Sequence, residues 1–193
     1  MFKPQRNVTL LFWEGVMTTA LCTRRIFPIV LAFLAYASAG FAQAQYEILH
    51  GFSGVPGQTL APLMEASNGE LYGVTTVGGT GGGGVVFALR PGPTAAFRIV
   101  HQLQPLDGGE PSGALVEVDG EFYGTTKSRG AAGFGTVFKI NATGTFELLH
   151  TFAGTDGAKP MAALVRGSDG ALYGTTSEGG PTNHGSIFRL GAD

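Results

Sequence analysis

The chain has 193 residues, of which 44% are hydrophobic and 13% charged, a composition that favours a packed core over intrinsic disorder. After residue 44 the chain carries 8 basic and 13 acidic residues, and this acidic balance argues against a nucleic-acid partner. Glycine is abundant, at 32 residues, without a three-residue period, so we expect it in turns and loops.

Residues 1–44 are predicted to be a signal peptide. Arg24 and Arg25 precede an apolar run at 26–37, and Ala42-Gln43-Ala44 is an A-x-A cleavage site. The apolar run is shorter than the roughly 20 residues of a membrane helix, so cleavage is favoured over an uncleaved anchor and no membrane span is expected afterwards. We therefore predict a secreted or periplasmic protein, with the Sec route favoured over twin-arginine export.

Three copies of one repeat follow, at about 46–96, 97–145 and 146–193. Tyr-Gly pairs recur at 72–73, 123–124 and 173–174, and each copy has four short apolar pieces that are bounded by glycine or proline, which is typical of strands. We name these pieces a (around His50, His101 and His150), b (around Leu63, Leu115 and Leu164), c (the Tyr-Gly pieces) and d (84–89, 135–140 and 185–190). The period of about 50 residues predicts an all-β, propeller-like fold.

The connections between these pieces predict the order of strands in a blade. Tight turns join b to c at Asn68-Gly69, Asp119-Gly120 and Asp169-Gly170, each a predicted type I′ hairpin, and d to a at 141–144. Long loops join c to d and a to b. The predicted blade is therefore four-stranded in the order b-c-d-a, and residues 46–52 are left as a lone strand that closes the last blade.

Three blades are fewer than the four to eight that propellers typically have. The copies could close as a small ring, two chains could pair as a homodimer with a six-bladed ring, or the chain could be a fragment of a longer array. Blade-number precedent favours the homodimer or the fragment.

The motif string across residues 46–190 resembles the bacterial GloVer tandem repeat family. The resemblance rests on Leu-His-x-Phe, Asp-Gly-x-x-Pro, Ser-Asp-Gly-x-Leu-Tyr-Gly-Thr-Thr and Gly-Thr-Val-Phe-Lys-Ile, as they stand at 149–152, 156–160, 168–176 and 135–140. It implies an extracellular protein with propeller-like repeats, and it supplies no catalytic residues.

Several residues invite a chemical role, but a structural one is favoured for each. His50, His101 and His150 share the apolar face of strand a with aromatic and aliphatic residues, so we predict hydrogen-bonded structural histidines and no metal site. The glycine run at 78–84 has neither the lysine nor the helix of a phosphate loop, so it is interpreted as a flexible loop. No cofactor and no catalytic residue are predicted.

The long loops are the predicted ligand-binding face, because function often sits on loops above a rigid scaffold. The c–d loops hold Lys127, Arg129, Glu178 and His184, where the copies differ most. The a–b loops add Asp107 and Asp156, although an aspartate at these places is also explained by its hydrogen bond to the backbone of the turn. The predicted function is a non-catalytic binding or structural module for a glycan or a cell-envelope protein. The alternative is a hydrolase or lyase acting on extracellular polysaccharide, which leaves enzymatic activity open.

Overall fold

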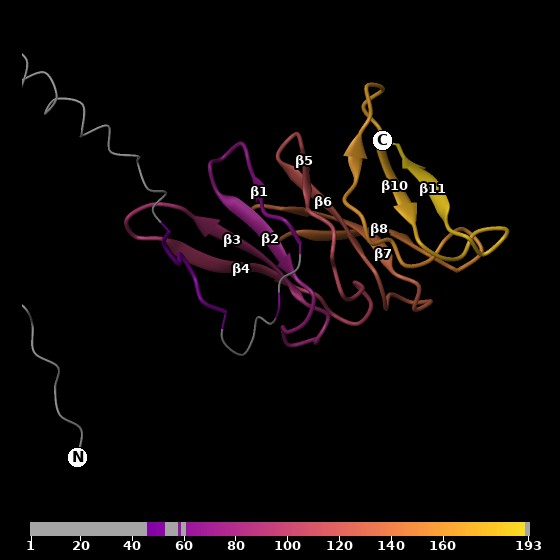
Figure 1. Cartoon of the computed structure of the whole chain (residues 1–193), viewed down its shortest axis with the longest axis horizontal. Helices are drawn as coiled ribbons and strands as arrows, with labels where there is room; N and C mark the ends of the chain where they lie inside the picture. Colours follow the sequence, from indigo (N-terminus) through magenta and orange to yellow (C-terminus); the bar gives the residue numbers. More distant parts are fainter. Residues whose placement is uncertain (1–45, 53–57, 59–60, 192–193) are drawn as a thin grey trace, which may run out of the picture. The chain divides into compact units, whose positions relative to one another are not determined.

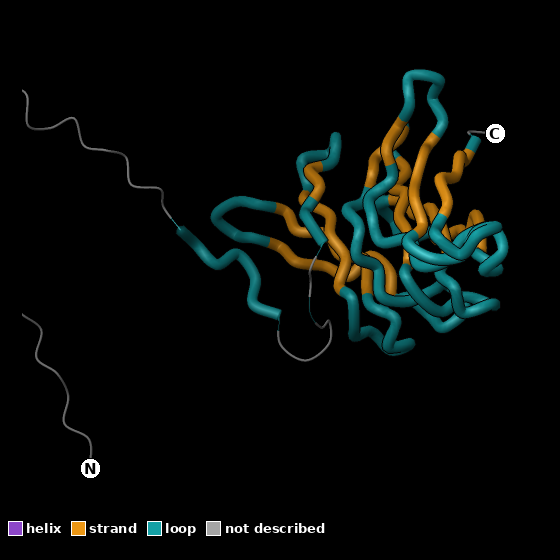
Figure 2. The backbone as a smooth tube through the Cα atoms, turned by 45° about the vertical axis from the view of Figure 1, so that its right-hand side comes forward, coloured by secondary structure: helices purple, strands orange, loops and turns teal. Residues whose placement is uncertain are grey.

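The computed structural model, which describes residues 46–52, 58 and 61–191, confirms the all-β prediction (Figures 1 and 2). All of its strands belong to one compact unit, residues 47–193. The predicted signal peptide, residues 1–44, lies outside the described residues. In the part of the chain that is described, no helix is long and apolar enough to span a membrane.

The strands form three antiparallel sheets, which we call blades 1, 2 and 3. Blade 1 has the order β1-β2-β3-β4, formed by Met64–Glu65, Leu71–Thr75, Val85–Arg90 and Ala96–Gln102. Blade 2 has the order β5-β6-β7-β8, formed by Val116–Val118, Glu121–Thr126, Thr136–Asn141 and Phe146–Thr151. Blade 3 has the order β9-β10-β11, formed by Val165–Arg166, Leu172–Thr176 and Ser186–Leu190. The predicted propeller-like repeat is therefore confirmed, with the order b-c-d-a in blades 1 and 2.

Blade 3 differs from the prediction, because it has three strands and residues 46–52 do not close it. They form no strand, and the rings of His50 and Phe52 pack on blade 1 instead. The His50 ring stacks on Phe97 of β4 at 3.9 Å, and the edge of Phe52 meets Phe87 of β3 at 5.3 Å. The physical reason is aromatic packing, since strand a of one repeat packs on the next blade throughout the chain.

The hydrophobic core lies between neighbouring blades and consists of two clusters. Buried side chains of blade 1, including Tyr72 and Val86, pack against Phe122 and Phe138 of blade 2, and the Tyr72 and Phe122 rings lie 4.1 Å apart. A second cluster joins Val137 of blade 2 to residues of blade 3. Burial of each such side chain contributes about 1.5–3 kcal/mol, so each blade depends on its neighbour for stability.

The glycine of each Tyr-Gly pair is required by a close aromatic contact. A Cβ atom on Gly124 would lie 2.6 Å from Cζ of Phe138 and 2.8 Å from Leu115, and Gly73 and Gly174 are placed in the same way. The phenylalanine ring of strand d thus lies directly on the glycine of strand c. Any side chain there would displace the ring.

The b–c turns differ in part from the three type I′ hairpins that were predicted. Asp119 and Gly120 both have positive φ, at 53° and 83°, as a type I′ turn requires. In the other two turns the glycine alone has positive φ, because the strands end earlier and leave a longer loop closed by a bond such as Ala66 N to Glu70 O. Blade 2 extends its inner strand to Val118, and only there is the connection two residues long.

Candidate functional site

The long loops lie at the end of the sheets opposite to the b–c turns (Figure 1). We call residues 76–84, 103–113, 127–135, 152–162 and 177–185 the loop face. Backbone bridges join its a–b loops to its c–d loops: Gly109 and Ser128 exchange hydrogen bonds of 2.7 and 3.0 Å, and Ala158 and Glu178 exchange bonds of 2.7 and 3.1 Å. The loop face is therefore fixed by main-chain hydrogen bonds.

Lys127 and Glu178 stand on equivalent c–d loops, and each forms an ion pair with an a–b loop. The two pairs have the positive and negative partners exchanged between the loops. The Lys127 ammonium of the c–d loop lies 3.3 Å from Glu110 of the a–b loop. In blade 3 the carboxylate is on the c–d loop, where Glu178 lies 2.7 Å from Lys159. The four side chains are partly exposed, and each pair presents a donor and an acceptor to solvent.

Arg129 links the loops of two blades. Its Nη1 donates to the carbonyl oxygen of Gly81 at 2.7 Å, and its aliphatic stem packs so closely on Gly109 that a Cβ atom there would lie 2.6 Å from Arg129 Cδ. Its φ is 63°, an uncommon value for a residue with a side chain. The arginine is thus held in place by backbone contacts on both sides.

Asp107 and Asp156 connect the a–b loops to the histidines of strand a. Asp107 Oδ2 lies 2.9 Å from His101 Nε2 and also accepts the backbone N–H of Gln104. Asp156 Oδ2 lies 2.8 Å from His150 Nε2, and its other oxygen accepts the Ala153 N–H. The structure therefore confirms that these two histidines are hydrogen-bonded, as predicted.

The environment of Asp156 favours its charged form. Burial raises the pKa of this carboxyl group, but the hydrogen bonds from the Ala153 backbone and from His150 outweigh burial and hold the pKa below its ordinary value of 3.8. Among the residues that the structure describes, no group of three or more histidine, cysteine or acidic side chains is placed to hold a metal ion.

His184 lies at the open side of blade 3. It is exposed, and with Thr175, Thr176 and Ile187 it lines a shallow hollow of about 270 Å³. The loop that carries it is closed on itself, because Gly185 N donates to Gly179 O at 3.0 Å. The six predicted residues are thus spread over the loops of all three blades.

Two exposed apolar side chains lie beside the loops of blade 2 and were not predicted as site residues. Leu106 is 67% exposed and Phe134 is 41% exposed. Pro105, next to Leu106, accepts a hydrogen bond from Gly130 at 3.1 Å, and the Phe134 ring faces Gly154. The signal in the sequence is that Phe134 stands where the other copies have Gly83 and His184.

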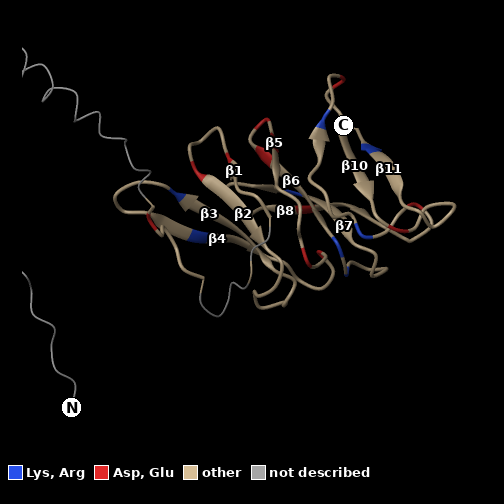
Figure 3. Ribbon diagram, viewed as in Figure 1, with Lys and Arg blue, Asp and Glu red and all other residues tan. Residues whose placement is uncertain are grey.

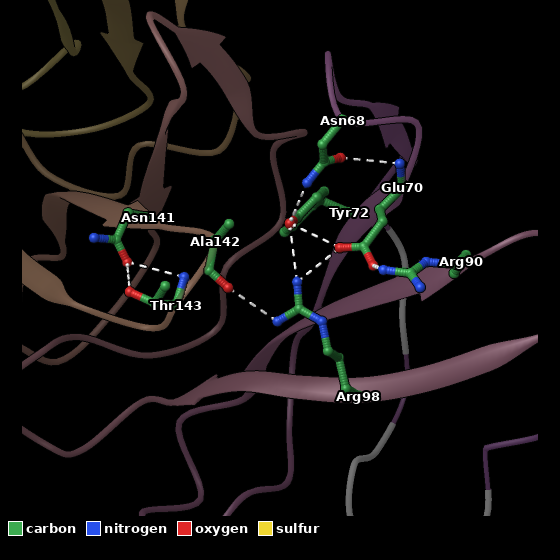
Figure 4. Close-up of polar contacts among 8 residues, drawn as sticks. All are labelled: Asn68, Glu70, Tyr72, Arg90, Arg98, Asn141, Ala142 and Thr143. Carbon is green, nitrogen blue, oxygen red and sulfur yellow. Dashed lines mark hydrogen bonds and ion pairs between the residues drawn. The ribbon is translucent and has the colours of Figure 1, made fainter.

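The opposite end of blade 1 holds an ionic network around one buried carboxylate, which sequence reasoning missed (Figure 4). Glu70 is only 7% exposed, and its oxygens accept from Arg98 at 2.7 Å, Arg90 at 3.0 Å and the Tyr72 hydroxyl at 3.1 Å. Arg98 also donates to the Ala142 carbonyl of blade 2 at 3.0 Å. The network therefore joins two blades.

Electrostatics make the Glu70 network a stable ionic arrangement. The Arg98 hydrogen bond lowers the pKa of Glu70 more than burial raises it, and Tyr72 and Arg90 lower it further. Blade 3 has a related arrangement, in which Asp169 accepts from Tyr173 at 2.8 Å and from Arg189 at 3.2 Å. Figure 3 shows basic and acidic residues interspersed over the blades. We interpret these networks as structural.

Comparison with known proteins gives the family of the chain. Residues 38–193 match the Gloeobacter/Verrucomicrobia repeat, so the chain belongs to that family, as the motif string had predicted. Curated protein sequences give no match. Among solved structures, an α-L-arabinofuranosidase from Clostridium thermocellum is similar at 14% identity and a TM-score of 0.42, over 68% of this chain and 48% of that one. This chain thus spans about half the length of that structure.

Proposed function

We propose that the chain is a secreted, non-catalytic binding module that recognises a neutral glycan through the loop face. The observation that carries the proposal is that the Lys127–Glu110 ion pair and the exposed side chains of Leu106 and Phe134 stand on loops that backbone hydrogen bonds hold together. Such a surface is pre-organised, so little conformational entropy is lost when a ligand binds.

The charge pattern favours a neutral sugar over a charged partner. Each lysine of the loop face is matched by a glutamate, so the net field is small while N–H donors and carboxylate acceptors remain available. A sugar hydroxyl group is both a donor and an acceptor and can use both members of a pair. The Phe134 ring adds an apolar surface of the kind that is enriched at binding interfaces.

Export is part of the same proposal and is supported by the sequence of residues 1–44. The apolar run followed by Ala42-Gln43-Ala44 has the features of a cleaved signal peptide. Exported bacterial proteins meet polysaccharides of the envelope and of the surroundings, so the compartment and the ligand class are consistent. Fractionation of cells that produce the full chain, followed by mass measurement of its N-terminus, tests this part.

The binding part is tested on a neutral-glycan array with the purified chain, followed by equilibrium titration of the best glycan. We expect Lys127→Ala and Phe134→Ala each to weaken binding about tenfold, which corresponds to about 1.4 kcal/mol. Arg166→Ala is the matched control, because Arg166 lies on β9 outside the loop face. Its distance from Asp119, 3.8 Å, is long for an ion pair, so little stability is lost with it. It should bind normally.

Three results would contradict the proposal. Glycan binding that survives the combined loss of Lys127, Arg129 and Phe134 would remove the loop face as the site. Capture of an envelope protein without any glycan binding would show that the ligand is a protein and not a glycan. Release of reducing sugar from a polysaccharide would show catalysis and favour the hydrolase alternative.

A further inference from the structure

The outer side of β11 has the sequence of an interior strand but is uncovered in the described part of the chain. Val86 in β3 and Val137 in β7 face the next blade and are 0% and 1% exposed, whereas their counterpart Ile187 in β11 has no described blade over it and is 81% exposed. In blades 1 and 2 the corresponding strand pairs with strand a on its outer side, through β4 and β8. The repeat therefore predicts a strand at the outer edge of β11.

A hollow beside β11 has the lining of a slot for an aromatic side chain. It has a volume of about 240 Å³ and is lined by Val137, Leu149, His150, Phe152, Asp156, Phe188, Arg189 and Leu190. In blade 1 the corresponding place is filled by Phe97, whose ring lies 3.9 Å from His50, 5.6 Å from Phe52 and 5.4 Å from Phe87.

Blade 2 fills the same slot with Phe146. Its ring stacks on His101 at 4.5 Å and on Phe138 at 5.3 Å. In blade 3 the matching walls are His150 and Phe188, so the hollow lacks only the aromatic residue that strand a supplies. Because the hollow in blade 3 has the same lining as the places of Phe97 and Phe146, we expect it to take an aromatic side chain.

Residues 46–52 have the sequence that this edge requires. Tyr-Glu-Ile-Leu-His-Gly-Phe aligns with Phe-Arg-Ile-Val-His-Gln-Leu at 97–103 and with Phe-Glu-Leu-Leu-His-Thr-Phe at 146–152. Tyr46 then corresponds to Phe97 and Phe146. Its side chain would fill the hollow, with its ring on His150.

The register of the added strand follows from blade 2. There Ile140 pairs with Phe146, Lys139 with Glu147 and Val137 with His150, and a bulge follows Val137. The same register places Leu190 opposite Tyr46, Arg189 opposite Glu47 and Ile187 opposite His50. Arg189 and Glu47 then repeat the Lys139–Glu147 ion pair, which measures 2.9 Å in blade 2.

We propose that residues 46–52 of a second copy add to β11 as the fourth strand of blade 3, and that reciprocal addition closes a six-bladed ring of two chains. Closure by the chain's own segment would give a ring of three blades, below the usual range of four to eight. Two copies instead reach six blades with a twofold axis, the commonest symmetry of homo-oligomers.

The faces of the blades are also complementary between the two copies. Ile187 and Val165 are exposed on the open face of blade 3, at 81% and 65%, and Leu63 is 51% exposed in blade 1. Their counterparts Val86 and Leu115 lie in the core between blades 1 and 2, and Met64, the counterpart of Val165, packs against that core. Stacking of blade 3 on blade 1 of the other copy would bury all three exposed side chains in the same way.

The proposal is tested with cysteine pairs in the full chain, after Cys22→Ser removes the native thiol. Glu47→Cys and Arg189→Cys face each other across the proposed strand pair, at a separation that a disulfide can span. We expect a two-chain disulfide product on a non-reducing gel. A mixture of the two single-cysteine chains should give the same product, since each chain contributes one partner.

Two controls calibrate this cross-link. Lys139→Cys with Glu147→Cys tests the same register inside blade 2 and should close within one chain. Glu47→Cys with Ser186→Cys is out of register and should cross-link at least tenfold less. A Glu47–Arg189 disulfide within one chain, or none while the blade 2 control forms, would overturn the proposal.

Discussion

Blades 2 and 3 have nearly the same strand sequences but differ in what covers them. Val137 and Phe138 are at most 1% exposed in blade 2, while Ile187 is 81% exposed and Phe188 is half-buried in blade 3. The residue types are alike, so the difference comes from what covers them: blade 2 has a fourth strand and a neighbouring blade, and blade 3 has neither in the described part of the chain. The comparison teaches that the apolar pattern of one repeat encodes its packing on the next repeat as well as its own sheet.

The largest effect is expected from placing a charge at the same position in the two blades. Val137→Asp buries an unpaired carboxylate between blades and should lower the free energy of unfolding by about 4 kcal/mol or prevent folding. Ile187→Asp places the charge on the open face and should leave each chain folded while abolishing the two-chain ring. Urea unfolding and sedimentation measure the two effects.

Equal destabilisation by the two substitutions would contradict the difference in cover between blades 2 and 3. If Ile187→Asp unfolds the chain as severely as Val137→Asp, then Ile187 is covered within a single chain. A variant of another exposed residue, Leu106→Asp, is the control, and its stability should change by less than about 0.5 kcal/mol.

The glycines of the Tyr-Gly pairs allow the same comparison of blades 2 and 3, with a smaller expected change in stability. Gly124→Ala would push a Cβ atom against Phe138, which is fully buried, and should cost about 1–3 kcal/mol through overpacking. Gly174→Ala makes the same contact with Phe188, which has room to move when blade 3 is uncovered. Measured by urea unfolding in the Ile187→Asp background, the cost at Gly174 should be the smaller of the two. Equal costs would contradict this account.

The fold was predictable because its signals are local and repeated three times. The Tyr-Gly and Val-Phe pieces, the turn residues and the loop lengths gave the strands and the order b-c-d-a. The place of residues 46–52 was not predictable in the same way, since their sequence fits both the edge of β11 and the face of blade 1. Likewise the turn type at Asn68-Gly69 depends on where β1 ends, which the dipeptide does not encode.

Glu70 gives a third test, at the turn end of blade 1. Glu70→Gln keeps the size of the side chain but removes its charge, and should cost about 1–2 kcal/mol at pH 7 because Arg98 and Arg90 lose their partner. The folded-state pKa of Glu70 is lowered from its ordinary value of 4.5. Its contribution is therefore present above about that pH and is lost as the pH falls through the lowered pKa.

Urea unfolding at a series of pH values measures this contribution. The difference between the parent chain and Glu70→Gln should be largest near pH 7 and should shrink as the solution is made more acidic. A difference that grows towards acid pH would contradict the network seen around Glu70.

The smallest expected effect comes from exchanging charges across the proposed strand pair. Glu47→Arg alone, or Arg189→Glu alone, places like charges opposite each other and should weaken the two-chain ring, by roughly fivefold or less because the pair is exposed. A mixture of the two variants should restore it, since every contact in the mixed ring pairs opposite charges. Titration by sedimentation checks both statements. No recovery in the mixture would argue against contact between chains.

The site was less predictable than the fold, for a physical reason. The copies differ at Lys127, Arg129, Glu178 and His184, and such differences mark positions that are free to change as well as positions that bind. The structure shows that Arg129 holds Gly81 and that Lys127 pairs with Glu110, contacts between residues far apart in sequence. The Glu70 network was missed because its arginines lie 20 and 28 residues away.

Sedimentation equilibrium of the full chain, with and without Ile187→Asp, tests the central claim most directly, which is that blade 3 is completed by residues 46–52 of a second copy. We predict the mass of two chains for the parent protein and of one folded chain for the variant. A parent protein that stays a single folded chain at all concentrations would contradict the account.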